Sequence, residues 1–440
     1  MRDIRLFLLL ASLSVGACAD DPSGPFGPSG PTPAVLVDHE FGEPPVAGTL
    51  QIVPSTATAG WRYRVEAIPP ETQDHEGLLE GAVALSYRFD EPGVHILRVE
   101  LTGPDGTVVV EKPIVVVDPD SDFEILAQRP VEEIWPDAAL NGVLYPEGIV
   151  MDPDGRWLYA ANYPSGELVR IDPATLEVVD RLQLARQLEG LSVTPSGDQL
   201  FAVHKGIGLS VVDLSSFTAT SMSPSVAEGH FIQALDEDHA LVSGHSSFAR
   251  VDMERGFVES NAAHLWAHPH FAVFPDGQRV VAGVSPWQET PFLEVLSLPS
   301  LSSLRSIPIE ELTNIQIVAV DPSGDRVYVI GWKDGETWFL LVDADTGDVL
   351  KSMGLGSKTC VCVANPVVTF ASGRHIAFER GGSVVIVDTE LNVPRYLFEP
   401  GGPLGDGPSS VAAQADSDIL FVLGGNFPIL RLYKIRLRNP

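Results

Sequence analysis

The stretch "DPDGRWLYAANYPSGELVRIDPATLEVV", residues 152–179, contains one unit of a pattern that recurs along the chain. It begins with a turn, continues with an apolar run typical of a strand, crosses a polar loop, and reaches another run that ends in Asp172. Related turns begin at residues 194, 235, 274, 321, 370 and 415, in steps of 39 to 49 residues. Repeats of this length, made of strands joined by polar turns, predict a circular array of sheets.

Each repeat has room for four strands, so seven repeats predict an all-β fold with a seven-bladed β-propeller over residues 122–440. The last repeat ends after its third strand at "ILRLYKIRL". Residues 122–130, before the first repeat, are expected to supply the missing outer strand and so close the ring. A parallel solenoid is the alternative repeat architecture, but short polar turns between strands favour antiparallel sheets.

The quoted unit resembles the YVTN-type propeller repeat, in which a D-G turn, an aromatic strand and an I-D-x-x-T strand end recur. The resemblance is strongest in the first, second, fifth and sixth repeats. It implies an extracytoplasmic binding or scaffold role. The lactonase-like relatives of this family imply enzymes that open or form lactone rings as a second reading.

A small antiparallel β-sandwich, of the immunoglobulin-like kind, is predicted for residues 47–118 because short alternating runs are separated by turn residues. In "HILRVEL", residues 95–101, Leu97, Val99 and Leu101 share the apolar face. The stretch "YRFDEPGVHILRVELTGPDG" resembles the end of a PKD-type domain. We therefore expect a PKD-like or immunoglobulin-like module before the propeller.

The first eighteen residues have the pattern of an export signal. Arg2 and Arg5 precede a short apolar run that ends in "VGAC" at Cys18. This ending resembles the lipobox of bacterial lipoproteins, which implies a lipidated Cys18, and Ala19 in place of Asp implies sorting to the outer membrane. The alternative is an ordinary signal peptide with an incidental Cys. The expected location is the cell envelope, facing the periplasm or the cell surface.

Composition limits the partners. With 28 Lys+Arg against 59 Asp+Glu the net charge is -31, which disfavours nucleic acid. Residues 19–46 are rich in Pro, Gly and Ser and are expected to form a disordered tether between the lipid anchor and the folded part. We expect a monomer that binds an envelope protein or a small polar ligand. The redox state of Cys360 and Cys362 stays open among free thiols, a strained disulfide and metal ligands.

Two positions of the repeat are expected at one mouth of the propeller channel. They lie five residues before the turn and ten residues after it, where the first strand begins and the second strand ends. With their neighbours in "WAHPHF", the candidates are Glu147, Asn162, Glu189, His204, His230, His245, His268, His270, Gln316, Asn365 and Arg380. By contrast, Asp152 and Asp154 belong to the repeated turn and are expected to be structural.

Imidazoles and carboxylates at one mouth could hold a divalent metal or a polar ligand, or act as acid and base. A solvated channel mouth without a function accounts for the same residues. The sequence contains no G-x-S-x-G, H-E-x-x-H or P-loop motif. The leading hypothesis is therefore a binding or scaffold protein without catalysis. A lactonase-like or metal-dependent hydrolase is the alternative, and copper-based redox chemistry is a weaker third.

Overall fold

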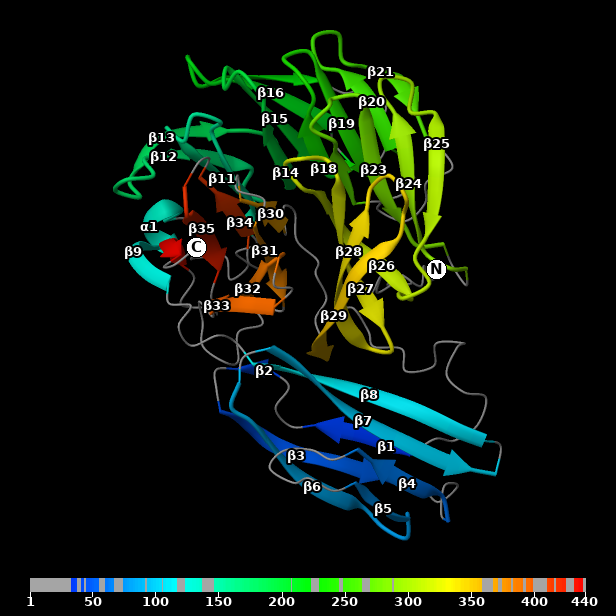
Figure 1. Cartoon of the computed structure of the whole chain (residues 1–440). Helices are drawn as coiled ribbons and strands as arrows, with labels where there is room; N and C mark the ends of the chain where they lie inside the picture. Colours follow the sequence, from blue (N-terminus) through cyan, green and yellow to red (C-terminus); the bar gives the residue numbers. More distant parts are fainter. Residues whose placement is uncertain are drawn as a thin grey trace, which may run out of the picture.

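The computed structural model describes most of the chain from residue 33 onward. The described ranges are 33–37, 41–42, 45–54, 60–66, 74–91, 93–104, 106–116, 123–136, 146–206, 208–222, 229–244, 248–262, 270–286, 289–357, 367–370, 374–380, 383–390, 393–398, 410–414, 417–424 and 431–437. Cys18, Cys360 and Cys362 lie outside them. Within these ranges the fold is all-β: sheets arranged around a centre form a seven-bladed propeller, and a small sandwich lies beside it (Figure 1).

Every blade described is a four-stranded antiparallel sheet with its strands in spatial order from the centre outward. Blade one contains β10 (Pro146–Met151), β11 (Leu158–Asn162), β12 (Glu167–Ile171) and β13 (Val178–Gln183). Blade two contains β14 (Leu188–Val193), β15 (Gln199–His204), β16 (Gly208–Asp213) and β17 (Thr218–Met222). Blade three contains β18 (Gly229–Ala234), β19 (His239–Gly244), β20 (Phe248–Asp252) and β21 (Phe257–Asn261).

The next three blades follow the same order. Blade four contains β22 (Phe271–Val273), β23 (Arg279–Val284), β24 (Phe292–Ser297) and β25 (Ser303–Pro308). Blade five contains β26 (Asn314–Val320), β27 (Arg326–Lys333), β28 (Glu336–Asp343) and β29 (Val349–Ser357). Blade six contains β30 (Val367–Thr369), β31 (His375–Arg380), β32 (Ser383–Asp388) and β33 (Val393–Phe398).

Both ends of the propeller segment meet in blade seven. Its inner strands are β34 (Ser410–Ala413), β35 (Ile419–Gly424) and β36 (Arg431–Leu437), and its outer strand is β9 (Phe123–Pro130). The strands β9 and β36 pair antiparallel along their length. The predicted closure of the ring by residues 122–130 is therefore confirmed. The short helix α1 (Val131–Ile134) follows β9 and packs with Trp135 between blades seven and one.

The hydrophobic core of the propeller is divided among the gaps between neighbouring blades. Among the described residues, one cluster of buried apolar side chains fills each gap. Between blades five and six, for example, the rings of Phe339 and Phe378 stack with centroids 6.1 Å apart. Because each strand places alternate side chains on opposite faces, every blade contributes to two gaps. Removing one large side chain should therefore weaken the contact between two blades.

The repeated turns have the geometry that was predicted. The carboxylate of Asp152 accepts a hydrogen bond from the N–H of Asp154 (2.8 Å), and Gly155 has φ of 67°. Burial raises the pKa of Asp152. At the end of the third strand, Asp172 accepts a hydrogen bond from the N–H of Ala174 (2.7 Å), and Asp213, Asp252, Asp343 and Asp388 make equivalent bonds. These carboxylates stabilise turns.

Two sheets form the sandwich. One has the order β1 (Ala34–Val37), β3 (Val46–Val53), β6 (Val83–Phe89). The other has the order β2 (Phe41–Gly42), β8 (Gly106–Val116), β7 (Gly93–Gly103), β4 (Arg62–Val65), β5 (His75–Leu78). Leu97, Val99 and Leu101 are fully buried in the shared core, as the alternation predicts.

The prediction of a disordered tether over residues 19–46 is wrong for its last part. Ala34–Val37 pairs antiparallel with β3, and Phe41–Gly42 pairs parallel with β8. The short run "AVLV" alternates, so that Val35 is buried in the sandwich core while Leu36 is exposed. Its Pro-rich surroundings concealed a strand of only four residues.

The sandwich contacts blade five of the propeller (Figure 1). The Nζ atom of Lys112 on β8 lies 2.9 Å from Oε1 of Glu336 on β28, and this Glu side chain is 4% exposed. No helix in the described part of the chain is long and apolar enough to cross a membrane.

Candidate functional site

The inner strands carry β-bulges at one mouth of the channel. In blades one, two, three and five, the pairing of the first strand with the second shifts register near the first residues of the inner strand. A bulge leaves a residue out of the ladder and turns its side chain in a new direction. The residues that fall in these bulges include four of the predicted mouth positions, Glu147, Glu189, His230 and Gln316.

Two of these residues meet across the gap between blades two and three. The Nδ1 atom of His230 contacts Oε2 of Glu189, and Nζ of Lys205 lies 3.2 Å from Oε1 of the same carboxylate. The Glu189 side chain is 9% exposed, His230 17% and Lys205 46%. We call these three residues the mouth cluster. It combines a nearly buried carboxylate with an imidazole and an ammonium group that solvent reaches.

The channel below this mouth has a wall of mixed polarity. It has a volume of about 480 Å³ and is lined by residues of the inner strand of every blade. Ile149, Leu191 and Val318 lie along it, but their side chains are almost fully buried in the gaps between blades. Ser192, Gln233 and Thr369 add polar groups, so that the wall is at least as polar as it is apolar.

An aromatic pair belongs to the same lining. The ring of Phe231, next to His230, lies 4.1 Å from that of His270, centroid to centroid. The channel therefore combines an aromatic pair with polar groups, in a cavity of the size of a small-molecule site.

Other predicted residues serve their own blades. His204 is 2% exposed, with Nε2 2.8 Å from Oγ of Ser210 and Nδ1 3.3 Å from the carbonyl oxygen of Arg186. A neutral ring that donates from Nδ1 and accepts at Nε2 satisfies both bonds. Burial lowers the pKa of His204, consistent with this neutral form. Asn162, also 2% exposed, accepts a long hydrogen bond from the N–H of Ser165 (3.4 Å) and closes its own turn.

The remaining candidates are less fully described. His245, His268 and Asn365 lie outside the described residues, and the side chains of Glu147 and Arg380 are not described, although both residues belong to strands. Gln316 lies in its bulge with Oε1 buried and no hydrogen bond from the described residues.

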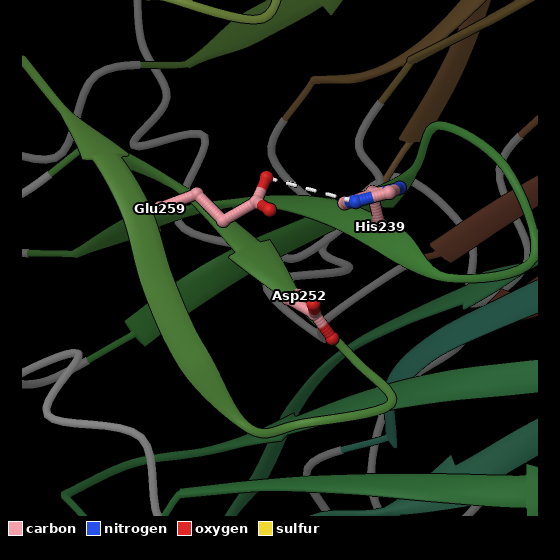
Figure 2. Close-up of side chains that lie close together, drawn as sticks. All are labelled: His239, Asp252 and Glu259. Atoms are coloured by element: carbon pink, nitrogen blue, oxygen red, sulfur yellow. Dashed lines mark ion pairs between the residues drawn. The ribbon is translucent and has the colours of Figure 1, made fainter.

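The described mouth residues do not form a compact set of metal ligands. Glu189 and His230 offer one oxygen and one nitrogen, but the Lys205 ammonium group lies against the same carboxylate and would repel a divalent cation. The predicted divalent metal at the mouth therefore stays a prediction that depends on side chains outside the described set. Within the described residues, three possible ligands lie close together at another place, formed by His239, Asp252 and Glu259 (Figure 2).

Sequence reasoning missed Lys205 and Phe231, although each directly follows a predicted mouth residue. It also missed the group around His239. The signal was the third turn, "LDED", which has acidic residues where four of the other turns have Pro and Gly and is followed by His239.

Comparison with solved structures agrees with the propeller fold. Hydrazine synthase from Kuenenia stuttgartiensis is similar with a TM-score of 0.55 and 17% identity, over 64% of this chain and 95% of that chain. The β-propeller domain of Cps50 (Swd1) from Myceliophteria thermophila is similar with a TM-score of 0.53 and 14% identity, over 72% of this chain and 100% of that chain. At such identities the likeness shows the fold alone.

No protein-family model and no curated protein matches the chain. The YVTN-type and PKD-like resemblances therefore stay predictions.

Proposed function

We propose that this protein is a non-catalytic binding protein whose propeller takes an amphiphilic ligand at the channel. An apolar group of the ligand would enter the channel, and its polar head would lie at the mouth cluster. The observation that carries this proposal is the cavity of about 480 Å³, with apolar and polar groups in its wall and the charged mouth cluster beside it.

The size and composition of the channel favour binding of a small molecule or a side chain of a partner protein. Its volume falls within the roughly 300 to 1,000 Å³ of ordinary ligand pockets. Burying an apolar group there contributes about 25 cal/mol for each Å² removed from water. Lys205 and His230 supply donors for the polar head, whereas Glu189 orients them through its two oxygens.

The test uses the amphiphilic dye 1-anilinonaphthalene-8-sulfonate, titrated into the purified protein and followed by its fluorescence. The variant Gln233→Trp fills the channel and should weaken dye binding at least about tenfold, since the apolar group loses its space. The matched control Gln278→Trp adds the same ring on an exposed turn of blade four and should leave the affinity unchanged. Equal affinities for the two variants would show that the dye binds elsewhere.

A second candidate function rests on the contact between His230 and Glu189. A carboxylate that holds an imidazole is the usual arrangement of a general base and its orienting group, which is what a lactonase-like hydrolase would need. We expect no hydrolysis of γ-butyrolactone or p-nitrophenyl acetate above the rate in buffer. Turnover that Glu189→Gln abolishes would favour this hydrolase over the binding function.

We further propose that the protein is exported and anchored in the envelope through a lipid on Cys18, acts as a monomer, and meets its ligand or an envelope protein there. The lipobox-like end of the first eighteen residues supports the anchor. In cells fed radiolabelled palmitate, the wild type should carry label and fractionate with membranes. Cys18→Ala should lose both properties, and label retained by this variant would contradict the proposal.

A further inference from the structure

A group of possible metal ligands lies in blade three, at the end of the blade away from the mouth cluster. His239 is the first residue of β19, Asp252 the last residue of β20, and Glu259 lies within β21. One ligand atom from each lies within 4.8 Å of the other two. Figure 2 shows the Glu259 carboxylate and the His239 imidazole turned toward one another, with Nε2 of His239 3.6 Å from Oε2 of Glu259.

The imidazole is oriented as in a metal ligand. Nδ1 of His239 lies 2.8 Å from Oδ1 of Asp236 and donates to it, so the neutral ring offers the lone pair of Nε2, the nitrogen nearer Glu259, to a metal. A histidine that binds metal through one nitrogen commonly donates from the other to a carboxylate in this way. The sequence "LDEDHA" thus supplies both the ligand and the group that orients it.

The two carboxylates differ in exposure. The side chain of Asp252 is 6% exposed, and one oxygen accepts a hydrogen bond from the N–H of Arg255 (2.7 Å) while the other lies 3.5 Å from the Arg255 guanidinium. Glu259 is 26% exposed, and its Oε2 contacts Nη1 of Arg250. His239 is 23% exposed, so solvent reaches the group from outside.

Two arginines contact this group, but the local charge remains negative. Asp236, Asp252 and Glu259 bring three negative charges, and Arg250 and Arg255 bring two positive ones. A cation would bind Glu259 through Oε1 while Oε2 keeps its contact with Arg250. Ligand atoms about 2.0 to 2.2 Å from a tetrahedral Zn²⁺ lie about 3.3 Å from each other, so the widest separation must close by at most about 1.5 Å.

Within the described residues, other blades contain parts of this arrangement but not the whole. In blade six His375 pairs with Asp388 as His239 pairs with Asp252, yet the residue in the outer-strand bulge is Arg395. In blades one, four and five the corresponding bulge residue is aliphatic and about half exposed, namely Val179, Leu304 and Leu350. In blade three the bulge residue is Glu259, because Val258 pairs with Val251 and Ser260 pairs with Arg250. Among the outer-strand bulges that the structure describes, a carboxylate therefore occurs in blade three alone.

We propose that blade three binds a divalent transition-metal cation of the Zn²⁺ class through His239, Asp252 and Glu259, with water completing the coordination. One imidazole nitrogen and two carboxylate oxygens suit Zn²⁺ among the first-row metals. Because the ligands come from three adjacent strands, the cation fastens the outer part of the blade and raises its stability. This site is independent of the function proposed for the channel.

The test measures Zn²⁺ binding to the full chain, purified in detergent and freed of metal with a chelator, by isothermal titration calorimetry. The wild type should bind one Zn²⁺ that His239→Gln and Glu259→Gln weaken at least about tenfold. The matched control His375→Gln removes the equivalent imidazole of blade six and should leave this binding unchanged. In the wild type and the control, Zn²⁺ should also raise the melting temperature.

Asp236→Asn provides a second variant that keeps all three ligands and the contact between Arg250 and Glu259. Loss of the negative charge should weaken Zn²⁺ binding about tenfold, because an amide oxygen accepts the hydrogen bond from Nδ1 more weakly than a carboxylate does and makes Nε2 less basic. A wild type that binds no Zn²⁺, or equal weakening by His239→Gln and His375→Gln, would overturn the proposal. The first result would mean that the group is only an ion-pair network, and the second that zinc binds diffusely to the acidic surface.

Discussion

The ion pair between Lys112 and Glu336 should hold the sandwich against blade five. At 2.9 Å the two charges attract by about 6 kcal/mol for an effective dielectric constant of 20. Desolvation offsets part of this, because the side chains are 16% and 4% exposed. In Lys112→Met, the Glu336 carboxylate loses this cation at a position that is almost fully buried. We expect the free energy of opening this contact to fall by about 3 kcal/mol. This is the low end for breaking a buried pair, since some water reaches Lys112.

Hydrogen exchange read by mass spectrometry measures this cost locally. Peptides that cover β28 should exchange about a hundredfold faster in Lys112→Met if opening of this strand limits exchange. Glu336→Gln in the same background should restore most of the protection, because the buried negative charge is removed. The matched control Arg98→Met breaks an exposed pair with Glu66 and should change exchange less than about fivefold. A change below about threefold in Lys112→Met would refute the reasoning.

Three further predictions concern stability. His204 has a lowered pKa in the folded protein against 6.5 in the unfolded chain, so its contribution is complete above pH 6.5 and is lost as the pH falls toward the folded-state pKa. His204→Gln should flatten this part of the curve of melting temperature against pH, and an unchanged slope would contradict the assignment. Phe339→Ala should cost about 3 to 5 kcal/mol in urea unfolding, because it opens a cavity between two blades. Gly331→Ala would place Cβ 2.1 Å from the Asn314 carbonyl oxygen and should cost more than about 2 kcal/mol, whereas Gly81→Ala, with open space around it, should change urea unfolding by less than about 1 kcal/mol.

The sequence predicts the propeller well because its signals are local and repeated. A turn residue such as Gly155 and an Asp at a strand end act within a few residues, and recurrence makes weak signals add up. Ring closure by β9 follows from counting strands, since an incomplete last repeat would leave an open edge. The contact between Glu189 and His230 also follows from repeat position, because both lie at equivalent places in neighbouring blades.

Side-chain direction is what the repeat alignment does not give. His204 and Lys205 are adjacent at the end of the same strand, yet His204 turns into its blade and Lys205 reaches the mouth cluster. Strand alternation allows either choice, and a shift of one residue reverses it. Bulges such as the one that holds Glu259 also depend on pairing with a neighbouring strand, so the sequence alone does not mark them.

The strand β9 is synthesised before all other strands of the propeller, and its partner β36 is synthesised after them. About 300 residues separate them, so bringing them together costs about 5 kcal/mol of chain entropy by the logarithmic loop relation, before the packing of six blades reduces it. Blade seven therefore cannot be completed until β36 has been synthesised. A chain that lacks β36 would keep β9 without its partner strand and leave blade seven with an open edge, where a second chain could add. Synthesis of β36 thus acts as a checkpoint for solubility as well as for folding.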